Sequence, residues 1–308
     1  MKSKLIDYVD NGPIFITGHV NPDGDALGSA FALKIFFDLQ NISSDVNFDI
    51  TTKLPSNLNH LPYHLISNDI KEKYNTVFVF DCGNSSRLGK YEDVVLAAQN
   101  IVVIDHHVDP SFGDVQIIDP HAASTTQVLF RQFKDEDIEI NEEMSNCLLT
   151  GLITDTGRFQ YSNTTSEVFS IAAELLSNGA NLSNISENIY GSIKFNALTL
   201  QSKIIERIVL NEELQFAHSI VFQNDYKDYQ VEPEETDFLI DVVRLVKEST
   251  VALLLKEQSD GSFKGSLRSR GDMDVQKIAS IFGGGGHVAA SGFSSNQSPE
   301  FILEKIEH

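Results

Sequence analysis

The sequence predicts an α/β protein: a parallel-sheet N-terminal domain with helices on both faces, joined by a helical linker to a smaller α+β domain. Short apolar runs at residues 14–17, 77–80 and 101–104 are β-branched or aromatic and do not alternate with polar residues. Such runs are typical of strands buried on both faces of a parallel sheet. Helical patterns lie between the runs, and this alternation of strand with helix favours an α/β layer architecture.

The clearest helix of the first domain is predicted at residues 25–40. There Leu27, Phe31 and Ile35 recur at helical spacing, while Lys34 falls on another face. Further helices are predicted at residues 144–154, 165–179 and 195–210. We interpret the last of these as the connector to the second domain.

Beyond residue 211 the predicted elements become shorter. We expect strands at residues 214–222, 251–258 and 262–269, and helices at residues 236–246 and 274–282. The predicted division is a first domain over residues 1–188, a helical linker over 189–211 and a second domain over 212–308.

The composition is that of a globular protein with a large core, since 41% of the 308 residues are hydrophobic. No apolar run approaches the roughly 18 to 20 residues of a membrane helix, and the first residues lack the apolar core of a secretory signal. The two cysteines, Cys82 and Cys147, lie in apolar segments where free thiols commonly sit. We therefore expect a cytoplasmic protein without a membrane partner.

The net charge of −21 argues against tight binding to long duplex nucleic acid. Such binding draws its strength from many lysine and arginine contacts to phosphates. A small anionic substrate is compatible with this charge if metal ions or a few arginines supply a local positive site.

Histidine and aspartate side chains, which commonly ligate metals, follow each of the three predicted strands. One more aspartate follows the helix predicted at residues 144–154. Ligands of open α/β sheets bind beyond the carboxyl ends of the strands, so we expect these side chains at one edge of the sheet. The candidates are His19, Asp23, Asp25, Asp81, His106, His107 and Asp155.

Four carboxylates and at least two imidazoles carry too much negative charge for a single zinc site. Mixed oxygen and nitrogen ligation suits Mn²⁺ or Mg²⁺, with cobalt or iron as further candidates and zinc as a poorer one. Six or seven ligands shared between two ions about 3.5 to 4 Å apart require a bridging carboxylate. A turn at residues 22–24 lets His19 and Asp23 serve one ion while Asp25 serves the other.

Four motifs, in this order and spacing, resemble those of the DHH phosphoesterase superfamily: "GHVNPDGDALGS", "VFDCGNSSRLG", "IDHHVDP" and "ITDTGRFQYS". The later stretch "GSLRSRGDMDVQKIASIFGGGGHVAASGF" resembles the DHH-associated substrate domain. The resemblance covers nearly the whole chain. It implies phosphoester hydrolysis with two divalent metal ions as cofactors. Mn²⁺ is the expected ion, and Mg²⁺ and Co²⁺ are the alternatives.

The resemblance also implies a role for each residue of the metal site. The implied ligands of the first ion are His19, Asp23 and Asp81. The implied ligands of the second ion are Asp25, Asp81, His106 and Asp155, with Asp81 as the bridge. In catalysis, Asp105 would orient a neighbouring imidazole or backbone group. His107 would contact the phosphoryl group as a hydrogen-bond donor or general acid.

Four arginines are candidates for contacts with the rest of the substrate. Arg268 and Arg270 lie near the end of a predicted strand of the second domain, where guanidinium groups could grip a phosphate or carboxylate. Arg87 and Arg158 lie in predicted loops of the first domain. These two could reach the substrate phosphate, or they could be surface charges or ion pairs.

A glycine run in the second domain leads into a histidine. Residues without β-carbons let backbone N–H groups come close to a phosphate or sugar. The candidate substrate contacts in this run are Gly284, Gly285, Gly286 and His287. One glycine would suffice to end the preceding helix, so the run favours close approach to a ligand.

Within the superfamily, the chain is most similar to the nanoRNases, which are bifunctional oligoribonucleases and 3′-phosphoadenosine-5′-phosphate phosphatases. The resemblance therefore implies short RNA oligonucleotides and 3′-phosphoadenosine 5′-phosphate as substrates, and it is compatible with a homodimer. A stand-alone phosphodiesterase for linear or cyclic dinucleotides is the alternative enzyme. A non-catalytic nucleotide-binding module is the alternative of another class.

Overall fold

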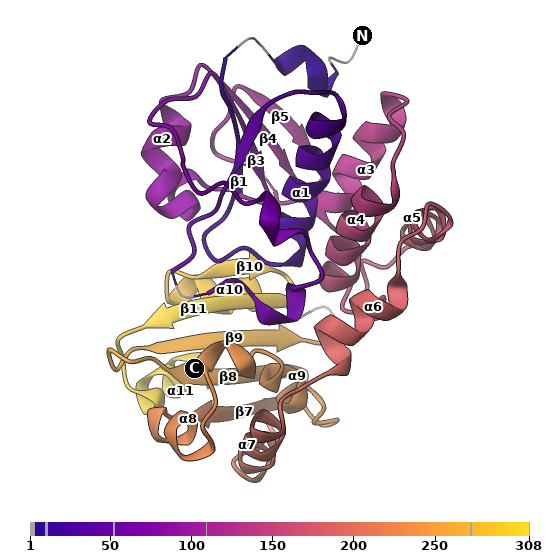
Figure 1. Ribbon diagram of the computed structural model, residues 1–308. Helices are drawn as coiled ribbons and strands as arrows, with labels where there is room; N and C mark the ends of the chain where they lie inside the picture. The colour runs from indigo at the N-terminus through magenta and orange to yellow at the C-terminus, as the bar shows by residue number, and fades with distance from the viewer. Residues whose placement is uncertain (1–3, 10–11, 52, 109, 272, 308) are drawn as a thin grey trace. The chain divides into compact units, whose positions relative to one another are not determined.

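Five parallel strands form the sheet of the N-terminal unit, in the order β2-β1-β3-β4-β5 (Figure 1). Their bounds are β1 Ile14–Gly18, β2 Ser44–Val46, β3 Thr76–Phe80, β4 Asn100–Asp105 and β5 Val115–Ile118. The three predicted strands are the central ones, so the expected parallel sheet is confirmed. The edge strands β2 and β5 are short and carry polar residues, and the sequence pattern does not predict them.

The computed structural model describes residues 4–9, 12–51, 53–108, 110–271 and 273–307. The chain divides into two compact units, Met1–Ser192 and Ile193–His308. The α-helices of the first unit are α1 Gly24–Leu39, α2 Glu92–Leu96, α3 Thr125–Asp135, α4 Glu142–Asp155, α5 Ser166–Ser177 and α6 Leu182–Ser186. Shorter helical turns are η1 Leu5–Tyr8, η2 Ser56–Leu58, η3 Tyr63–Leu65, η4 Ser85–Tyr91 and η5 Glu187–Gly191.

Successive residues of the central strands enter two different cores. In β3, Phe78 and Phe80 belong to the core that contains residues of α1, α3 and α4. Val77 and Val79 belong to a second core with Leu88 of η4 and residues of α2. Because both faces of the strand are buried, its sequence is apolar throughout and does not alternate.

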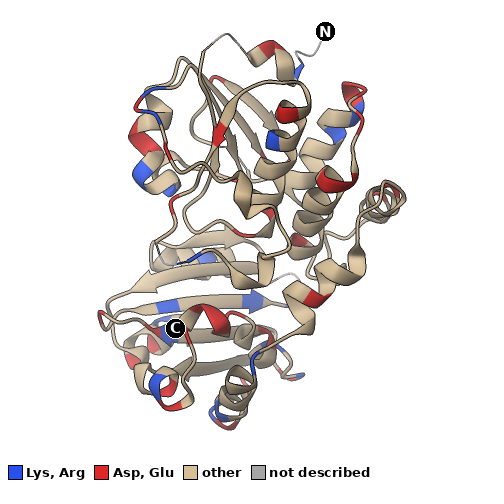
Figure 2. Ribbon diagram, viewed as in Figure 1, with Lys and Arg blue, Asp and Glu red and all other residues tan. Residues whose placement is uncertain are grey.

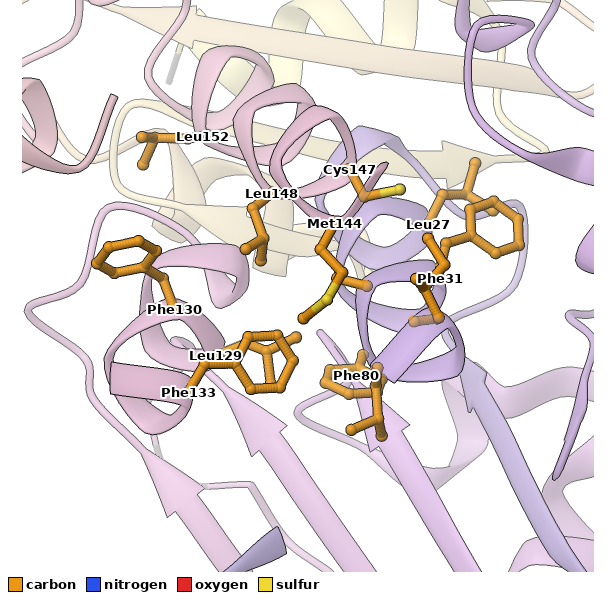
Figure 3. Packing of buried hydrophobic residues seen from close by; sticks show 14 of the residues in the cluster. Leu27, Phe31, Phe80, Leu129, Phe130, Phe133, Met144, Cys147, Leu148 and Leu152 are labelled. Atoms are coloured by element: carbon orange, nitrogen blue, oxygen red, sulfur yellow. The ribbon is translucent and has the colours of Figure 1, made fainter. Parts of the chain in front are cut away.

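Helices α1 and α4 pack closely against each other. Figure 3 shows Met144 and Cys147 of α4 in the same cluster as Leu27 and Phe31 of α1. Gly28 lies at this contact, since a Cβ atom there would be 2.4 Å from the carbonyl oxygen of Cys147. The missing side chain therefore permits the close approach of the two helices.

The C-terminal unit contains a mixed six-stranded sheet in the order β10-β11-β9-β8-β7-β6. Strands β7 and β8 pair in parallel, and the other neighbours pair antiparallel. The strands are β6 Val209–Asn211, β7 Phe216–Val221, β8 Val251–Glu257, β9 Phe263–Ser269, β10 Gly285–His287 and β11 Ala290–Ser295. The helices are α7 Phe195–Glu206, α8 Gln223–Tyr229, η6 Pro233–Thr236, α9 Leu239–Arg244, α10 Val275–Ile281 and α11 Pro299–Glu307.

The helix predicted at residues 195–210 is too long. α7 ends at Glu206, and Val209 with Leu210 enters strand β6 beside β7. Pairing with a neighbouring strand stabilises this β-branched segment as a strand, and local periodicity does not show that partner. Ala197 and Leu200 of α7 pack in the core of the C-terminal unit. The linker role of residues 189–211 stays a prediction.

Among the described residues, no helix combines the length and the apolar character that a bilayer span requires. Acidic positions are spread over the elements of both units rather than gathered in one tract (Figure 2). The net charge of −21 is therefore distributed along the chain.

Candidate metal centre

His19 directly follows β1. Its Nδ1 lies 2.9 Å from the carbonyl oxygen of Val20, and this contact sets the orientation of the ring. As a result, Nε2 lies 3.4 Å from Oδ2 of Asp81 and 3.8 Å from Oδ2 of Asp23.

Asp23 is the N-cap residue of α1. Its Oδ1 accepts hydrogen bonds from the backbone N–H groups of Asp25, at 3.0 Å, and Ala26, at 3.1 Å. The other carboxylate oxygen, Oδ2, faces His19. One residue therefore starts the helix and offers a ligand atom.

Asp25 lies in the first turn of α1 and is fully buried. Its carboxylate accepts two hydrogen bonds from the first turn of α3. The backbone N–H of Thr125 donates to Oδ2 at 2.5 Å, and that of Thr126 donates to Oδ1 at 2.9 Å. The positive end of the α3 dipole thus faces a buried negative charge.

Asp81 follows β3 with a backbone φ of 55°, a left-handed conformation that is uncommon for a residue other than glycine. Its Oδ1 accepts a hydrogen bond from the hydroxyl of Thr125 at 3.1 Å. The same oxygen lies 3.3 Å from Nδ1 of His107 and 3.6 Å from Nε2 of His106. Because Oδ2 faces His19, the carboxylate lies between imidazoles on two sides.

Asp105 ends β4, and its carboxylate contacts the two residues that follow it. Its Oδ1 accepts hydrogen bonds from the backbone N–H groups of His106, at 2.7 Å, and His107, at 3.0 Å. The same oxygen also lies 2.7 Å from Nδ1 of His107. His106 turns the other way, with Nδ1 3.2 Å from the carbonyl oxygen of Ala122 and Nε2 3.3 Å from Oδ2 of Asp155.

Six of the seven ligand candidates fall into two compact groups, each with its donor atoms within 4.8 Å of one another. The first group is His19, Asp23 and Asp81, and the second is Asp25, His106 and Asp155. Asp81 also approaches the second group through His106. A third group is Asp81, Asp105 and His107. In that group Asp105 and His107 are paired with each other by a hydrogen bond.

The neighbouring carboxylates raise the pKa values of the imidazoles of His19 and His106. Burial by itself lowers the pKa of His19, but hydrogen bonds and charges of Asp23 and Asp81 outweigh burial and raise this pKa to about 10. Burial also disfavours the protonated form of His106, and the hydrogen bond and charge of Asp155 reverse this effect and raise its pKa to about 11. Positive charge between these carboxylates is thus strongly favoured.

The carboxylates also repel one another. Burial and the negative charges of Asp155 and Asp81 raise the pKa of Asp25 well above its usual range. Burial raises the pKa of Asp155 to about 6, against the hydrogen bond of His106. Buried like charges at this spacing are costly unless cations lie among them. With its mixed oxygen and nitrogen donors, this set of residues fits divalent metal ions.

Arg87 and Arg158 lie in the N-terminal unit, outside the two ligand groups. Arg87 is in η4, where its backbone carbonyl accepts a hydrogen bond from the N–H of Val20 at 2.7 Å and its side chain is exposed. The guanidinium of Arg158 stacks over the ring of Tyr190, 3.9 Å from the ring centre. A role of either arginine in substrate binding stays a prediction.

The two arginines of the C-terminal unit differ in their contacts. Arg268 lies in β9, and its Nε is buried without a hydrogen-bond partner among the described atoms. Arg270 donates hydrogen bonds to the carbonyl oxygens of Val246, at 3.2 Å, and Arg244. These bonds hold the chain after α9, so Arg268 is the better candidate for a ligand contact.

The glycine run leads into β10, which pairs with β11 in an antiparallel hairpin. A Cβ at Gly284 would lie 2.2 Å from a carbonyl oxygen of β11, and one at Gly286, whose φ is 138°, would lie 2.7 Å from that of Ala290. Close strand pairing therefore requires these two glycines. A Cβ at Gly285 would have no neighbour within 4 Å, and His287 ends β10 opposite Ala290.

Sequence reasoning missed the first turn of α3. There Ser124 caps the helix by accepting a hydrogen bond from the N–H of Gln127 at 3.1 Å, and Thr125 and Thr126 contact the ligand candidates. A signal was present, because serine before a helical pattern is a typical N-cap. It predicts a helix start but not which carboxylates the helix contacts.

Two regions of the chain match models of known families. Residues 13–152 match the N-terminal domain of the DHH family, and residues 213–308 match the DHHA1 domain. Together these regions include every candidate metal ligand except Asp155, three residues beyond the first match.

Relatives with similar sequences and folds extend over the whole chain. A Thermus thermophilus protein named bifunctional oligoribonuclease and PAP phosphatase NrnA is 32% identical, over 96% of this chain and 89% of its own. A Streptococcus mutans protein named probable bifunctional oligoribonuclease and PAP phosphatase NrnA is 28% identical, over 92% and 89%. The crystal structure of an exopolyphosphatase-related protein from Bacteroides fragilis matches with a TM-score of 0.87 and 25% identity, over 98% of this chain and 92% of that one.

Proposed function

The chain belongs to the DHH family, and on this basis we propose that it is a two-metal phosphoesterase. Its proposed substrates are short RNA oligonucleotides, cleaved to 5′-mononucleotides, and 3′-phosphoadenosine 5′-phosphate, cleaved to AMP and phosphate. The observation that carries the proposal is the position of Asp81 relative to the two ligand groups. Asp81 belongs to the first group, beside His19, and also lies 3.6 Å from His106 of the second group. The names of the two NrnA relatives support the choice of substrates.

In this proposal, His19, Asp23 and Asp81 hold one ion, and a second set holds the other. The second set is Asp25, Asp81, His106 and Asp155. Mn²⁺ is the preferred ion, because both sets mix carboxylate oxygens with an imidazole nitrogen. Bound divalent ions supply Lewis acidity at phosphorus and lower the pKa of water.

His107 is the proposed general acid. Burial lowers its pKa, but hydrogen bonds to Asp105 and Asp81 outweigh burial and raise that pKa to about 10, which favours the imidazolium. Asp105 holds Nδ1 at 2.7 Å, so a proton for the leaving oxygen would come from Nε2.

The C-terminal unit is the proposed site of recognition for the rest of the substrate. Arg268 has a buried guanidinium nitrogen without a partner among the described atoms, which suits an anionic ligand. Gly285 leaves room for close approach beside His287. Both cysteines are free and buried, which is typical of reducing compartments, and we propose a cytoplasmic location.

Parallel assays with Mn²⁺ test the proposal on three substrates: a diribonucleotide, 3′-phosphoadenosine 5′-phosphate and a cyclic dinucleotide. We expect turnover of the first two. Preferential turnover of the cyclic dinucleotide would favour the alternative phosphodiesterase, and the absence of any phosphoester hydrolysis would overturn the proposal.

Asp81→Asn separates an enzyme from a nucleotide-binding module. An enzyme should lose turnover by more than the roughly 10- to 100-fold expected for an outer-shell group. Asp93→Asn, which removes an exposed carboxylate in α2, is the matched control and should retain turnover. Full turnover in Asp81→Asn would exclude the proposed bridge.

A further inference from the structure

Thr125, which is not itself a ligand candidate, contacts two carboxylates of the metal centre. Its hydroxyl donates to Oδ1 of Asp81 at 3.1 Å, and its backbone N–H donates to Oδ2 of Asp25 at 2.5 Å. Thr125 is fully buried, so water does not compete for either contact. Thr125 therefore links Asp81, which contacts residues of both ligand groups, to Asp25 of the second group.

The hydroxyl constrains the plane of the Asp81 carboxylate. Rotation about the last side-chain bond of an aspartate is soft, because this torsion has broad minima. The backbone position of Asp81 fixes its Cβ, but it leaves this rotation open. Together with Nδ1 of His107, which lies 3.3 Å from the same oxygen, this donor at Oδ1 selects the orientation in which Oδ2 lies 3.4 Å from His19 and Oδ1 lies 3.6 Å from His106.

The position of the hydroxyl is itself well determined. Ser124 caps α3, and the N–H groups of Thr125 and Thr126 each bind one oxygen of Asp25. The first turn of α3 is therefore fixed relative to Asp25. The hydroxyl carries that constraint across to Asp81.

We propose that Thr125 is a positioning residue of the metal centre: its hydroxyl holds Asp81 in the orientation that lets one carboxylate serve both ions. The inference rests on the proposed function, since it requires that the two groups bind metal ions. It adds a residue outside both ligand groups and assigns a positioning effect to its hydroxyl.

Thr126 provides a matched control in the same helical turn. It is also buried, but its hydroxyl lies 2.7 Å from Oγ of Ser124 and makes no hydrogen bond to a carboxylate of the described residues. Thr126→Val and Thr125→Val each remove one buried hydroxyl and keep the backbone N–H to Asp25. A general loss of stability should therefore affect both variants alike.

The test measures binding of Mn²⁺ alone, by calorimetry and by electron paramagnetic resonance. In the wild type we expect two ions and the exchange-coupled spectrum of a bridged pair. In Thr125→Val we expect the affinity for one ion to fall by about 10- to 100-fold, as for other outer-shell partners, with loss of the coupled spectrum. Thr126→Val should keep the wild-type affinity and the coupled spectrum. Thr125→Ser retains the hydroxyl, so it should have the same two properties.

Each other outcome has a distinct meaning. A coupled pair in Thr125→Val with wild-type affinity would overturn the inference and leave the proposed function standing. Equal losses in Thr125→Val and Thr126→Val would also overturn it, because the cause would then be general. If the wild type binds no Mn²⁺, the proposed function fails first. Unfolding measurements on each variant verify that the compared proteins are folded.

Discussion

Asp81 combines a strained backbone with a buried carboxylate that lies between the ligand candidates. A left-handed φ at an aspartate costs free energy that the surrounding structure must offset. Here the histidines lower the pKa of Asp81 well below its usual range in spite of burial, so the carboxylate stays ionised. The strain and the charge occur at one residue, which is typical of functional sites.

Substituting His107 tests the proposed general acid. His107→Asn should reduce turnover of a diribonucleotide by about 10²- to 10⁴-fold, because proton donation to the leaving oxygen is lost. With a p-nitrophenyl phosphoester the loss should be much smaller, since that leaving group needs no proton. Kinetic assays of both substrates measure the difference. His121→Asn, at an exposed histidine, serves as control, and equal losses with both substrates would exclude a general acid.

The pKa values of the imidazoles predict a pH dependence of metal binding. In the absence of cations, the pKa values of His19 and His106 are about 10 and 11, so near neutral pH both rings carry a proton that a metal ion must displace. Mn²⁺ binding should therefore release protons and weaken as the pH falls. Calorimetry in buffers with different ionisation enthalpies measures this release. Binding that is independent of pH would contradict the assignment of these ligands.

The topology of the N-terminal unit explains where the ligand candidates lie in it. Its strand order reverses between β1 and β3, and such a reversal is where open α/β sheets bind ligands. His19 follows one of these strands and Asp81 follows the other. Helices α1 and α3 then bring Asp25 and Thr125 together through their first turns.

The contact of α1 with α4 predicts the effect of a substitution at Gly28. In Gly28→Ala, the new Cβ would lie 2.4 Å from a carbonyl oxygen of α4, so the helices must separate. We expect a loss of about 1–3 kcal/mol in the free energy of unfolding from this overpacking, although alanine gains about 1 kcal/mol in helix propensity. Urea unfolding measures the change. Ser170→Ala, at an exposed position of α5, is the propensity control and should not destabilise; stabilisation by Gly28→Ala would contradict the close contact.

At the scale of the whole molecule, the metal ligands that the sequence predicts, from His19 to Asp155, lie in the N-terminal unit. The whole chain is strongly acidic, with a net charge of −21. Such a field attracts divalent cations and repels polyanions. It is compatible with a substrate that has only a few phosphates.

Metal ions should stabilise the N-terminal unit. A ligand that binds only the folded state adds about 2.7 kcal/mol at a concentration 100 times its Kd. We therefore expect a higher unfolding temperature with Mn²⁺ than with a chelator, measured by thermal unfolding. Hydrogen exchange should slow mainly in β1, α1 and α3. Protection confined to residues 193–308 would contradict the location of the site.

Local pattern was sufficient to predict the central strands and α1, and it predicts ligand candidates after those strands. The burial of β1, β3 and β4 on both faces is visible as apolar runs, and ligand residues follow those strands directly along the chain. The motif resemblance to the DHH family is confirmed by the matched regions and relatives. The assignment of each ligand to an ion stays a prediction.

The sequence by itself thus determined after which strands the candidate metal ligands lie, because strand burial and motif spacing are local properties. Only the tertiary structure decided how these residues are held. Thr125 and Asp25 are 100 positions apart, and no periodicity within either segment predicts their hydrogen bond. The end of α7 and the edge strands β2 and β5 likewise depend on partners distant in the chain, because strand pairing overrides local propensity.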